Sequence, residues 1–149
     1  REPLLSLNRE DIVVINGKRN IAFERKIKKQ SKRIKVFYSN YEIESFKKLK
    51  KKKLLAFAGI GNPDSFFEIL SRNKFIVDTK VSFPDHYKYK IDELNNLKEI
   101  AKKKGLSLVT TEKDFFRIKK LGIKNIYYIS VTLKISNSKK FEKELLKKI

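Results

Sequence analysis

The stretch that decides the fold reads Leu54-Leu55-Ala56-Phe57-Ala58-Gly59-Ile60-Gly61-Asn62-Pro63-Asp64. Residues 54–60 form the longest continuous apolar run of the chain, which is typical of a buried strand. The next four residues supply a turn, an N-cap asparagine, a proline at the first helical position and an acid in the first turn. The stretch therefore predicts a buried strand that leads into a helix from about Pro63 to Arg72.

Strand and helix patterns alternate over the rest of the chain. The predicted strands are Phe75–Ser82, Leu106–Thr110 and Asn125–Thr132, and the predicted helices are Ile91–Lys104, a helix that opens at Thr111, and Ser138–Ile149. Gly105 follows the first of these helices, as a C-terminal cap should. This alternation predicts an α/β fold with a parallel or mixed sheet flanked by helices.

The sequence before residue 54 has a different pattern. Residues 1–10 are compatible with a helix, and residues 11–17 predict a buried strand that ends in an Asn-Gly turn. Ile21–Arg25 and Ile34–Tyr38 predict a two-stranded antiparallel ribbon, and the basic run Lys47–Lys53 predicts a linker or an exposed helix end outside the core. We therefore divide the chain into residues 1–20, the end of an N-terminal domain; residues 21–53, a two-stranded linker with a basic connector; and residues 54–149, a C-terminal α/β domain.

The composition excludes several classes of protein. None of the 149 residues is cysteine, so a disulfide scaffold, a structural zinc finger and a thiol nucleophile are excluded. No apolar run approaches the roughly 20 residues of a membrane-spanning helix, and no signal peptide opens the chain, so any membrane contact is expected to be peripheral or to lie outside this segment. The chain has no methionine and begins at Arg1, so we expect either that a methionine was removed or that the sequence is a piece of a longer protein.

The net charge of +20 comes from 37 Lys and Arg against 17 Asp and Glu. Nucleic acid and the surface of an acidic bilayer both favour clustered cations, the first through counterion release and the second through its surface potential. A general bias toward lysine, with charges on every solvated helix face, accounts for the same number. Charge alone leaves these three interpretations open.

Three loops carry the residues that suit chemistry, and each follows a predicted strand: Gly59–Pro63, Phe83–Tyr87 and Thr110–Asp114. Open α/β sheets place their ligand sites at the carboxyl ends of the strands, so we expect these loops at one edge of the sheet. Gly59-x-Gly61 before a helix suits phosphate binding, but it lacks the remaining residues of a dinucleotide fingerprint or a P-loop, and turn-and-cap chemistry also explains it.

The other two loops also have a chemical and a structural interpretation. His86 is the only histidine, and histidine is the side chain whose unperturbed pKa suits proton transfer near neutral pH; a structural role is the alternative. The Thr111–Asp114 group is a capping-box candidate, and its acids are also able to hold a cation or orient a lysine.

Taken together in this order, the three loops resemble the C-terminal part of the tetraacyldisaccharide 4'-kinase family, the lipid A 4'-kinases. The resemblance rests on residues 56–63 with Phe66-Phe67, on Phe83-Pro84-Asp85-His86, and on residues 110–114. Arg1-Glu2-Pro3-Leu4 and residues 11–17 resemble the segment where the family's N-terminal domain ends. The resemblance covers the chain from Arg1 to about Leu133.

The resemblance implies a membrane-associated P-loop kinase that transfers the γ-phosphate of ATP to the 4'-hydroxyl of tetraacyldisaccharide 1-phosphate. Residues 1–20 would then close the P-loop domain. No P-loop motif exists in this chain, so ATP and Mg²⁺ would be bound mainly by a missing N-terminal part, and the chain alone would be inactive. The implied partners are the lipid A precursor and an anionic membrane surface at the cytoplasmic face of the bacterial inner membrane, reached peripherally or through the missing part, with no nucleic acid and no obligate protein partner.

The resemblance also assigns residues. His86 matches the histidine that the family pairs with a catalytic aspartate, and Tyr87 stands where many members have a second histidine, so His86 is the single catalytic candidate. Arg1 and Glu2 match an Arg-Glu pair on the nucleotide and Mg²⁺ side. The motif positions expected to shape the cleft are Asn62, Asp85, Glu112, Lys113 and Asp114. No metal site is expected within the chain itself.

An alternative from another class is a basic α/β module that binds RNA without catalysis. It rests on the net charge of +20 and on Phe37, Tyr38 and Tyr41, aromatic residues near Lys and Arg that are able to stack on bases. No RRM or KH signature is present. Salt-dependent binding to RNA, without preference for anionic vesicles, would favour this alternative.

Overall fold

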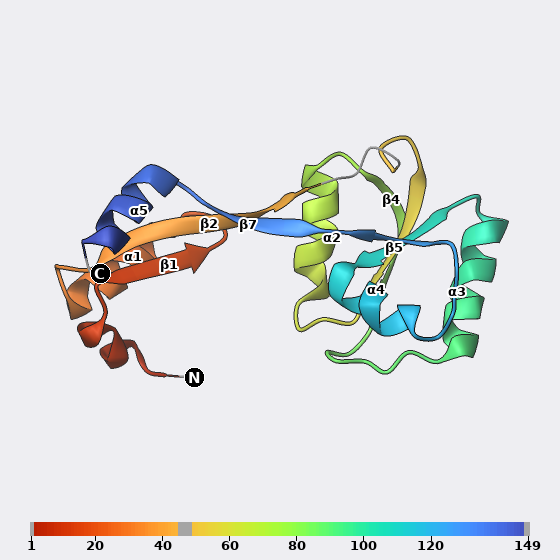
Figure 1. Ribbon diagram of the computed structural model, residues 1–149, viewed down its shortest axis with the longest axis horizontal. Coiled ribbons are helices and arrows are strands. Elements are labelled where there is room, and N and C mark those ends of the chain that lie inside the picture. Colours follow the sequence, from red (N-terminus) through yellow and green to blue (C-terminus); the bar gives the residue numbers. More distant parts are fainter. Residues whose placement is uncertain (1, 45–48, 148–149) are drawn as a thin grey trace. The chain divides into compact units, whose positions relative to one another are not determined.

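The computed structural model describes residues 2–44 and 49–147, which form two compact units (Figure 1). Unit 1 combines Arg1–Glu42 with Leu133–Ile149, and unit 2 is Ile43–Thr132. The chain therefore passes from unit 1 into unit 2 and back again.

Unit 2 is built on a four-stranded parallel sheet with the strand order β4-β3-β5-β6. Its elements are β3 (Lys53–Ala58), α2 (Pro63–Arg72), β4 (Ile76–Ser82), α3 (Ile91–Lys103), β5 (Ser107–Thr111), α4 (Glu112–Lys119) and β6 (Ile126–Ile129). The predicted α/β fold class is confirmed. Helix α2 begins where the sequence predicts, because the side chain of Asn62 accepts the N–H of Ser65 at 3.1 Å.

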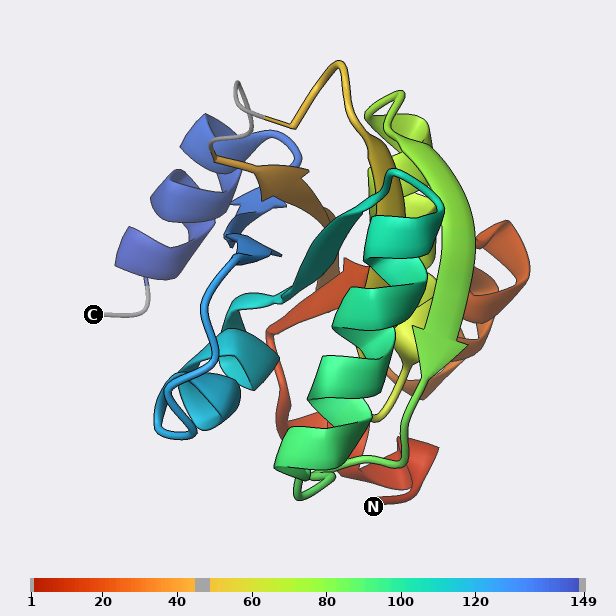
Figure 2. The ribbon, with the colours of Figure 1, turned by 90° about the vertical axis from the view of Figure 1, so that its right-hand side faces the viewer.

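Helices cover both faces of this sheet. Leu54, Ala56 and Ala58 of β3 pack with α2, whereas Leu55 and Phe57 pack with α3 and α4. Figure 2 shows α3 in front of the sheet. Because the helix after β3 lies on one face and the helix after β5 on the other, the topological switch point lies between these two strands.

Unit 1 is built on a three-stranded sheet with the order β1-β2-β7. Its elements are the 3-10 helix η1 (Leu4–Arg9), β1 (Ile12–Asn16), α1 (Ile21–Gln30), β2 (Lys35–Ile43), β7 (Val131–Ile135) and α5 (Ser138–Leu146), although the last residue of β2 and the first two of β7 are grouped with unit 2. β1 and β2 are parallel. Ser136 N donates to Tyr38 O, and Glu44 N donates to Ser130 O, so β2 and β7 run antiparallel. Phe141 of α5 meets Phe37 of β2 edge to face, with 5.2 Å between ring centroids.

The predicted ribbon strand at Ile21–Arg25 is wrong, because these residues begin α1. The side chain of Asn20 caps the helix by accepting the N–H of Phe23 at 2.9 Å. Ile27 lies four residues after Phe23, which is helical spacing, and it is fully buried. The second predicted strand, Ile34–Tyr38, corresponds to β2, whose neighbours are β1 and β7.

Two further predictions need correction. Asn125–Thr132 is not one strand: β6 ends at Ile129 in the sheet of unit 2, and β7 begins at Val131 in the other sheet. The β-branched and aromatic residues on both sides of Ser130 favour strands, and they carry no sign of a change of sheet. Within the basic run 47–53, residues 47 and 48 lie outside the described residues, Leu49 is a buried core residue against expectation, and Lys53 begins β3.

The division into residues 1–20, 21–53 and 54–149 stays a prediction, because it refers to the domains of a longer protein. In the structure α5 groups with unit 1. Within the described ranges, we find no helix with both the length and the apolar character needed to cross a bilayer.

Candidate active site

The loops that follow β3, β4 and β5 meet at the carboxyl edge of the sheet in unit 2. Gly59, the first residue after β3, donates its backbone N–H to Oδ2 of Asp114 on α4 at 2.9 Å. Gly61 lies against the loop after β4, because a Cβ at this position would be 3.3 Å from Oδ2 of Asp85. The three loops predicted to share an edge are therefore in contact at the switch point, where sheets of this kind place ligand sites.

Asp114 is the buried centre of this edge, with no solvent exposure. Its Oδ2 accepts from the Gly59 N–H at 2.9 Å and from the Thr111 hydroxyl at 2.8 Å, and its Oδ1 accepts from Arg117 Nη1 at 3.1 Å. Thr111 also caps α4, since its hydroxyl oxygen accepts the N–H of Asp114 at 3.1 Å. The predicted helix cap is therefore present at Thr111. In addition, the Asp114 carboxylate accepts the backbone N–H of Gly59 at the end of β3.

Gly59 has a structural role that explains its place in the motif. Its N–H is already bonded to Asp114, so this amide is not free to bind a phosphate. A Cβ at Gly59 would lie 2.7 Å from Oη of Tyr89 and 3.2 Å from Cβ of Tyr87. The missing side chain thus lets the loop after β4 approach the end of β3, and the turn interpretation holds for Gly59.

His86 lies in a tight turn of the loop after β4. The Tyr87 N–H donates to the Pro84 carbonyl at 3.3 Å, which closes the turn, and His86 has a φ of 58°, in the left-handed region. The Asp85 carboxylate accepts the backbone N–H of His86 at 2.9 Å. Local strain of this kind is common at functional sites. The side chain of His86 is 71% exposed, so the turn presents the imidazole to solvent.

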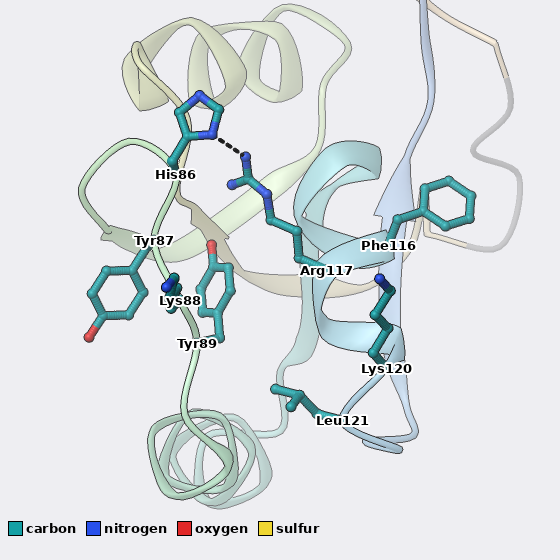
Figure 3. A pocket seen from close by; sticks show the side chains of 8 residues that line it. All are labelled: His86, Tyr87, Lys88, Tyr89, Phe116, Arg117, Lys120 and Leu121. Carbon is teal, nitrogen blue, oxygen red and sulfur yellow. Dashed lines mark hydrogen bonds between the residues drawn. The ribbon is translucent and has the colours of Figure 1, made fainter.

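Arg117 of α4 holds the imidazole from the protein side (Figure 3). Its Nη2 lies 3.1 Å from Nδ1 of His86, and its Nη1 donates to the Gly59 carbonyl at 3.1 Å as well as to Asp114. The sequence interpretation missed Arg117. Its position three residues after Asp114 places both side chains on one helix face, and this spacing was available in the sequence as a sign of an ion pair.

Tyr89 is buried beside the same carboxylate. Its hydroxyl has no hydrogen-bond partner among the residues that the structure describes. Burial raises the pKa of the Tyr89 phenol, and the negative charge of Asp114 raises it further. The hydroxyl therefore stays protonated over the physiological range.

A pocket of about 720 Å³ opens beside this network (Figure 3). It is lined by His86, Tyr87, Lys88, Tyr89, Phe116, Arg117, Lys120 and Leu121. Lys88, Arg117 and Lys120 make the lining basic, and Tyr87, Tyr89 and Phe116 supply large aromatic rings. Such a lining suits an anionic group attached to a ring or a sugar.

The other residues predicted to belong to the site lie in several parts of the structure. Asn62 caps α2, Glu112 accepts the Ser130 hydroxyl at 3.0 Å, and Lys113 is exposed on α4. Glu2 belongs to unit 1, where it pairs with Arg9 at 2.6 Å. Arg1 lies outside the described residues. The structure therefore brings together Asp85, His86 and Asp114 at one edge, with Asn62 and Glu112 on the helices that begin there.

The residues at this edge offer little to ATP or Mg²⁺. Within the described part of the chain, no three or more His, Cys, Asp or Glu residues converge to hold a metal ion. The Gly59 amide is occupied by Asp114, and no P-loop sequence is present. These residues do not form a nucleotide–metal site by themselves.

Comparison with known proteins identifies the family. The chain matches the family described as LpxK, tetraacyldisaccharide-1-P 4'-kinase, over residues 1–149. The chain belongs to this family. The tetraacyldisaccharide 4'-kinase of Pelagibacter ubique (strain HTCC1062) is 32% identical over 152 residues, which cover 99% of this chain and 48% of that protein. The tetraacyldisaccharide 4'-kinase of Rhodopseudomonas palustris (strain BisB5) is 38% identical over 109 residues, 70% of this chain and 32% of that protein.

The chain thus spans about half the length of the Pelagibacter kinase. Among solved structures, the "apo" form of LpxK from Aquifex aeolicus in complex with ATP matches with a TM-score of 0.57 and 22% identity. The match covers 99% of this chain and 45% of that one. At this identity the likeness shows a shared fold.

Proposed function

We propose that this chain is the portion of a lipid A 4'-kinase that lacks the Walker A loop. Together with an ATP-binding part, it would phosphorylate the 4'-hydroxyl of tetraacyldisaccharide 1-phosphate. The observation that carries the proposal is the exposed imidazole of His86, anchored through Arg117 to buried Asp114 at the carboxyl edge of the sheet. An exposed imidazole at this edge of the sheet is well placed to assist phosphoryl transfer to a sugar hydroxyl.

In this proposal His86 pairs with a catalytic aspartate that lies outside this chain. Asp85 and Asp114 hold the backbone and the guanidinium around it, and Asn62, Glu112 and Lys113 shape the helix ends of the same edge. Arg1 and Glu2 would lie on the nucleotide and Mg²⁺ side. ATP and Mg²⁺ would be bound mainly by the other part of the enzyme, so the chain alone is expected to be inactive.

The pocket beside His86 supports a phosphorylated sugar as the substrate class, because Lys88, Arg117 and Lys120 surround it with positive charge. The net charge of +20 supports peripheral contact with an anionic membrane surface, at the cytoplasmic face of the bacterial inner membrane. Nucleic acid and an obligate protein partner are not part of the proposal. For the RNA-binding alternative, Phe37 is buried and the Tyr38 hydroxyl donates to Glu24 at 2.8 Å, which leaves Tyr41 as the exposed member of the three aromatics.

The proposal is tested by assaying the full-length protein that contains this chain, with ATP, Mg²⁺ and tetraacyldisaccharide 1-phosphate. We expect phosphate transfer to the 4'-hydroxyl by the full-length protein and none by residues 1–149 alone. Absence of transfer by the folded full-length protein, combined with salt-dependent RNA binding, would contradict the proposal and favour the alternative.

A further inference from the structure

The contact between Arg117 and His86 favours one tautomer of the neutral imidazole. A guanidinium has five N–H donors and no acceptor, and it stays protonated in proteins. Because Nη2 of Arg117 lies 3.1 Å from Nδ1 of His86, a hydrogen bond between them requires Nδ1 to accept. A neutral His86 then carries its proton on Nε2.

The guanidinium is held on its other side. Its Nη1 donates to Oδ1 of the fully buried Asp114 and to the carbonyl of Gly59, both at 3.1 Å. Asp114 is in turn fixed by the Gly59 N–H and the Thr111 hydroxyl. The donor that faces His86 therefore belongs to a connected network between the end of β3 and the start of α4, and the side chain of Arg117 is only 25% exposed.

Among the residues that the structure describes, none makes a hydrogen bond with Nε2 of His86. The nearest carboxylate oxygen, Oδ2 of Asp85, is 3.8 Å from Nε2, which is too long for a hydrogen bond. The same Asp85 side chain accepts the His86 backbone N–H through Oδ1, so it stabilises the turn. The Nε2–H group remains available to an acceptor that approaches from solvent.

We infer that Arg117 is a positioning residue for His86, and that the guanidinium anchored by Asp114 holds the imidazole with Nδ1 as acceptor and Nε2–H as the outward donor. The catalytic consequence rests on the proposed function. His86 donates a hydrogen bond from Nε2 to the group it assists, such as the carboxylate that takes the proton of the sugar hydroxyl, and does not accept that proton at Nε2 itself.

The first test reads the imidazole directly, without activity. Full-length protein is labelled with ¹⁵N-histidine, and the His86 signals are those lost in His86→Gln. At a pH where the ring is neutral, we expect an unprotonated Nδ1 and a protonated Nε2. In Arg117→Ala both tautomers are populated, so the two ¹⁵N shifts move toward each other.

Two variants control for folding. Arg117→Lys keeps a cation beside buried Asp114 but lacks the fork that bonds Asp114 and His86 together, so its ring shifts should resemble those of Arg117→Ala. Lys119→Ala removes an exposed cation of the same helix and should leave the shifts unchanged. Ring shifts that are identical in wild type, Arg117→Ala and Arg117→Lys would overturn the inference.

The second test is a double-mutant cycle on the kinase reaction. Arg117→Lys should lower kcat by about tenfold or more, as loss of a group that orients a functional histidine does, with both KM values nearly unchanged. In the His86→Ala background the same substitution should cost nothing further. Additive losses would overturn the inference. A fully active His86→Ala enzyme would contradict the proposed function. It would leave the positioning role of Arg117 to be judged by the ring shifts, which do not depend on turnover.

Discussion

Oδ2 of Asp114 accepts the backbone N–H of Gly59 at 2.9 Å and so joins the start of α4 to the end of β3 across 55 residues of sequence. The other oxygen of the same carboxylate holds Arg117, which contacts His86. One buried carboxylate therefore organises the edge of the sheet that presents the imidazole.

Replacement of Asp114 with alanine is expected to lower the free energy of unfolding of unit 2 by about 3 kcal/mol, because a buried ion pair loses one partner and the Gly59 N–H loses its acceptor. Urea denaturation measures this difference. Asp64→Asn, at an exposed position in the first turn of α2, is the control and should change stability by no more than about 0.5 kcal/mol. If the two substitutions changed the free energy of unfolding equally, Asp114 would not be the residue that stabilises this edge of the sheet.

Gly59→Ala is expected to destabilise the protein by about 1–3 kcal/mol, because the added Cβ would lie 2.7 Å from Oη of Tyr89. Adding Tyr89→Phe removes that oxygen and should restore part of the loss. Gly61→Ala is the matched control, since its Cβ would meet only the exposed Asp85 carboxylate, at 3.3 Å. A Gly59→Ala protein as stable as Gly61→Ala would show that the loop adjusts freely.

Tyr89→Phe by itself should leave stability unchanged or raise it by about 1 kcal/mol, because the buried hydroxyl has no hydrogen-bond partner among the described residues. Tyr87→Phe is the contrasting variant. The Tyr87 hydroxyl donates to Glu93 at 2.6 Å, so its removal should destabilise the protein. Thermal unfolding measures the stability of both variants. If Tyr89→Phe lost as much stability as Tyr87→Phe, the Tyr89 hydroxyl would have to make a stabilising hydrogen bond, which would contradict the prediction.

The strand-to-helix stretch at residues 54–64 was predictable because its signals are local. The apolar run marks a strand buried on both faces, and Asn62 and Pro63 mark the helix start within a residue. The strand predicted at Ile21–Arg25 is wrong because the Asn20 side chain caps a helix there, although β-branched and aromatic residues favour a strand. Local chemistry was sufficient only where all of its signals agreed.

The candidate site was predictable in part. Because each loop follows a predicted strand of an α/β sheet, the sequence was enough to expect the three loops at one edge, and the resemblance selected His86. The contacts of Gly59 with Asp114 and of Arg117 with His86 join residues 55 and 31 positions apart, so no local pattern indicates them. Long-range hydrogen bonds of this kind depend on the register and packing of the strands, which the sequence periodicity does not specify.

The stability conferred by Glu93 should depend on pH. Its pKa is lowered, first by the hydrogen bond from Tyr87 and then by the Lys90 N–H, which donates at 3.0 Å. A carboxyl whose pKa is lower in the folded state stabilises the protein above its unfolded-state pKa, and this contribution is lost as pH falls through the folded-state pKa. In urea denaturation at several pH values, Glu93→Gln should be less stable than wild type at neutral pH, and the gap should close below the ordinary value of 4.5. A gap that stays constant down to acid pH would contradict this reading.

The most direct measurement of the central claim is the turnover of the full-length kinase carrying His86→Ala, with saturating ATP and tetraacyldisaccharide 1-phosphate and with Lys119→Ala as the matched control. The account predicts a loss of kcat of about 10²-fold or more for His86→Ala, the size of lost acid–base assistance, and wild-type kcat for Lys119→Ala. Near wild-type turnover of a folded His86→Ala enzyme would contradict it.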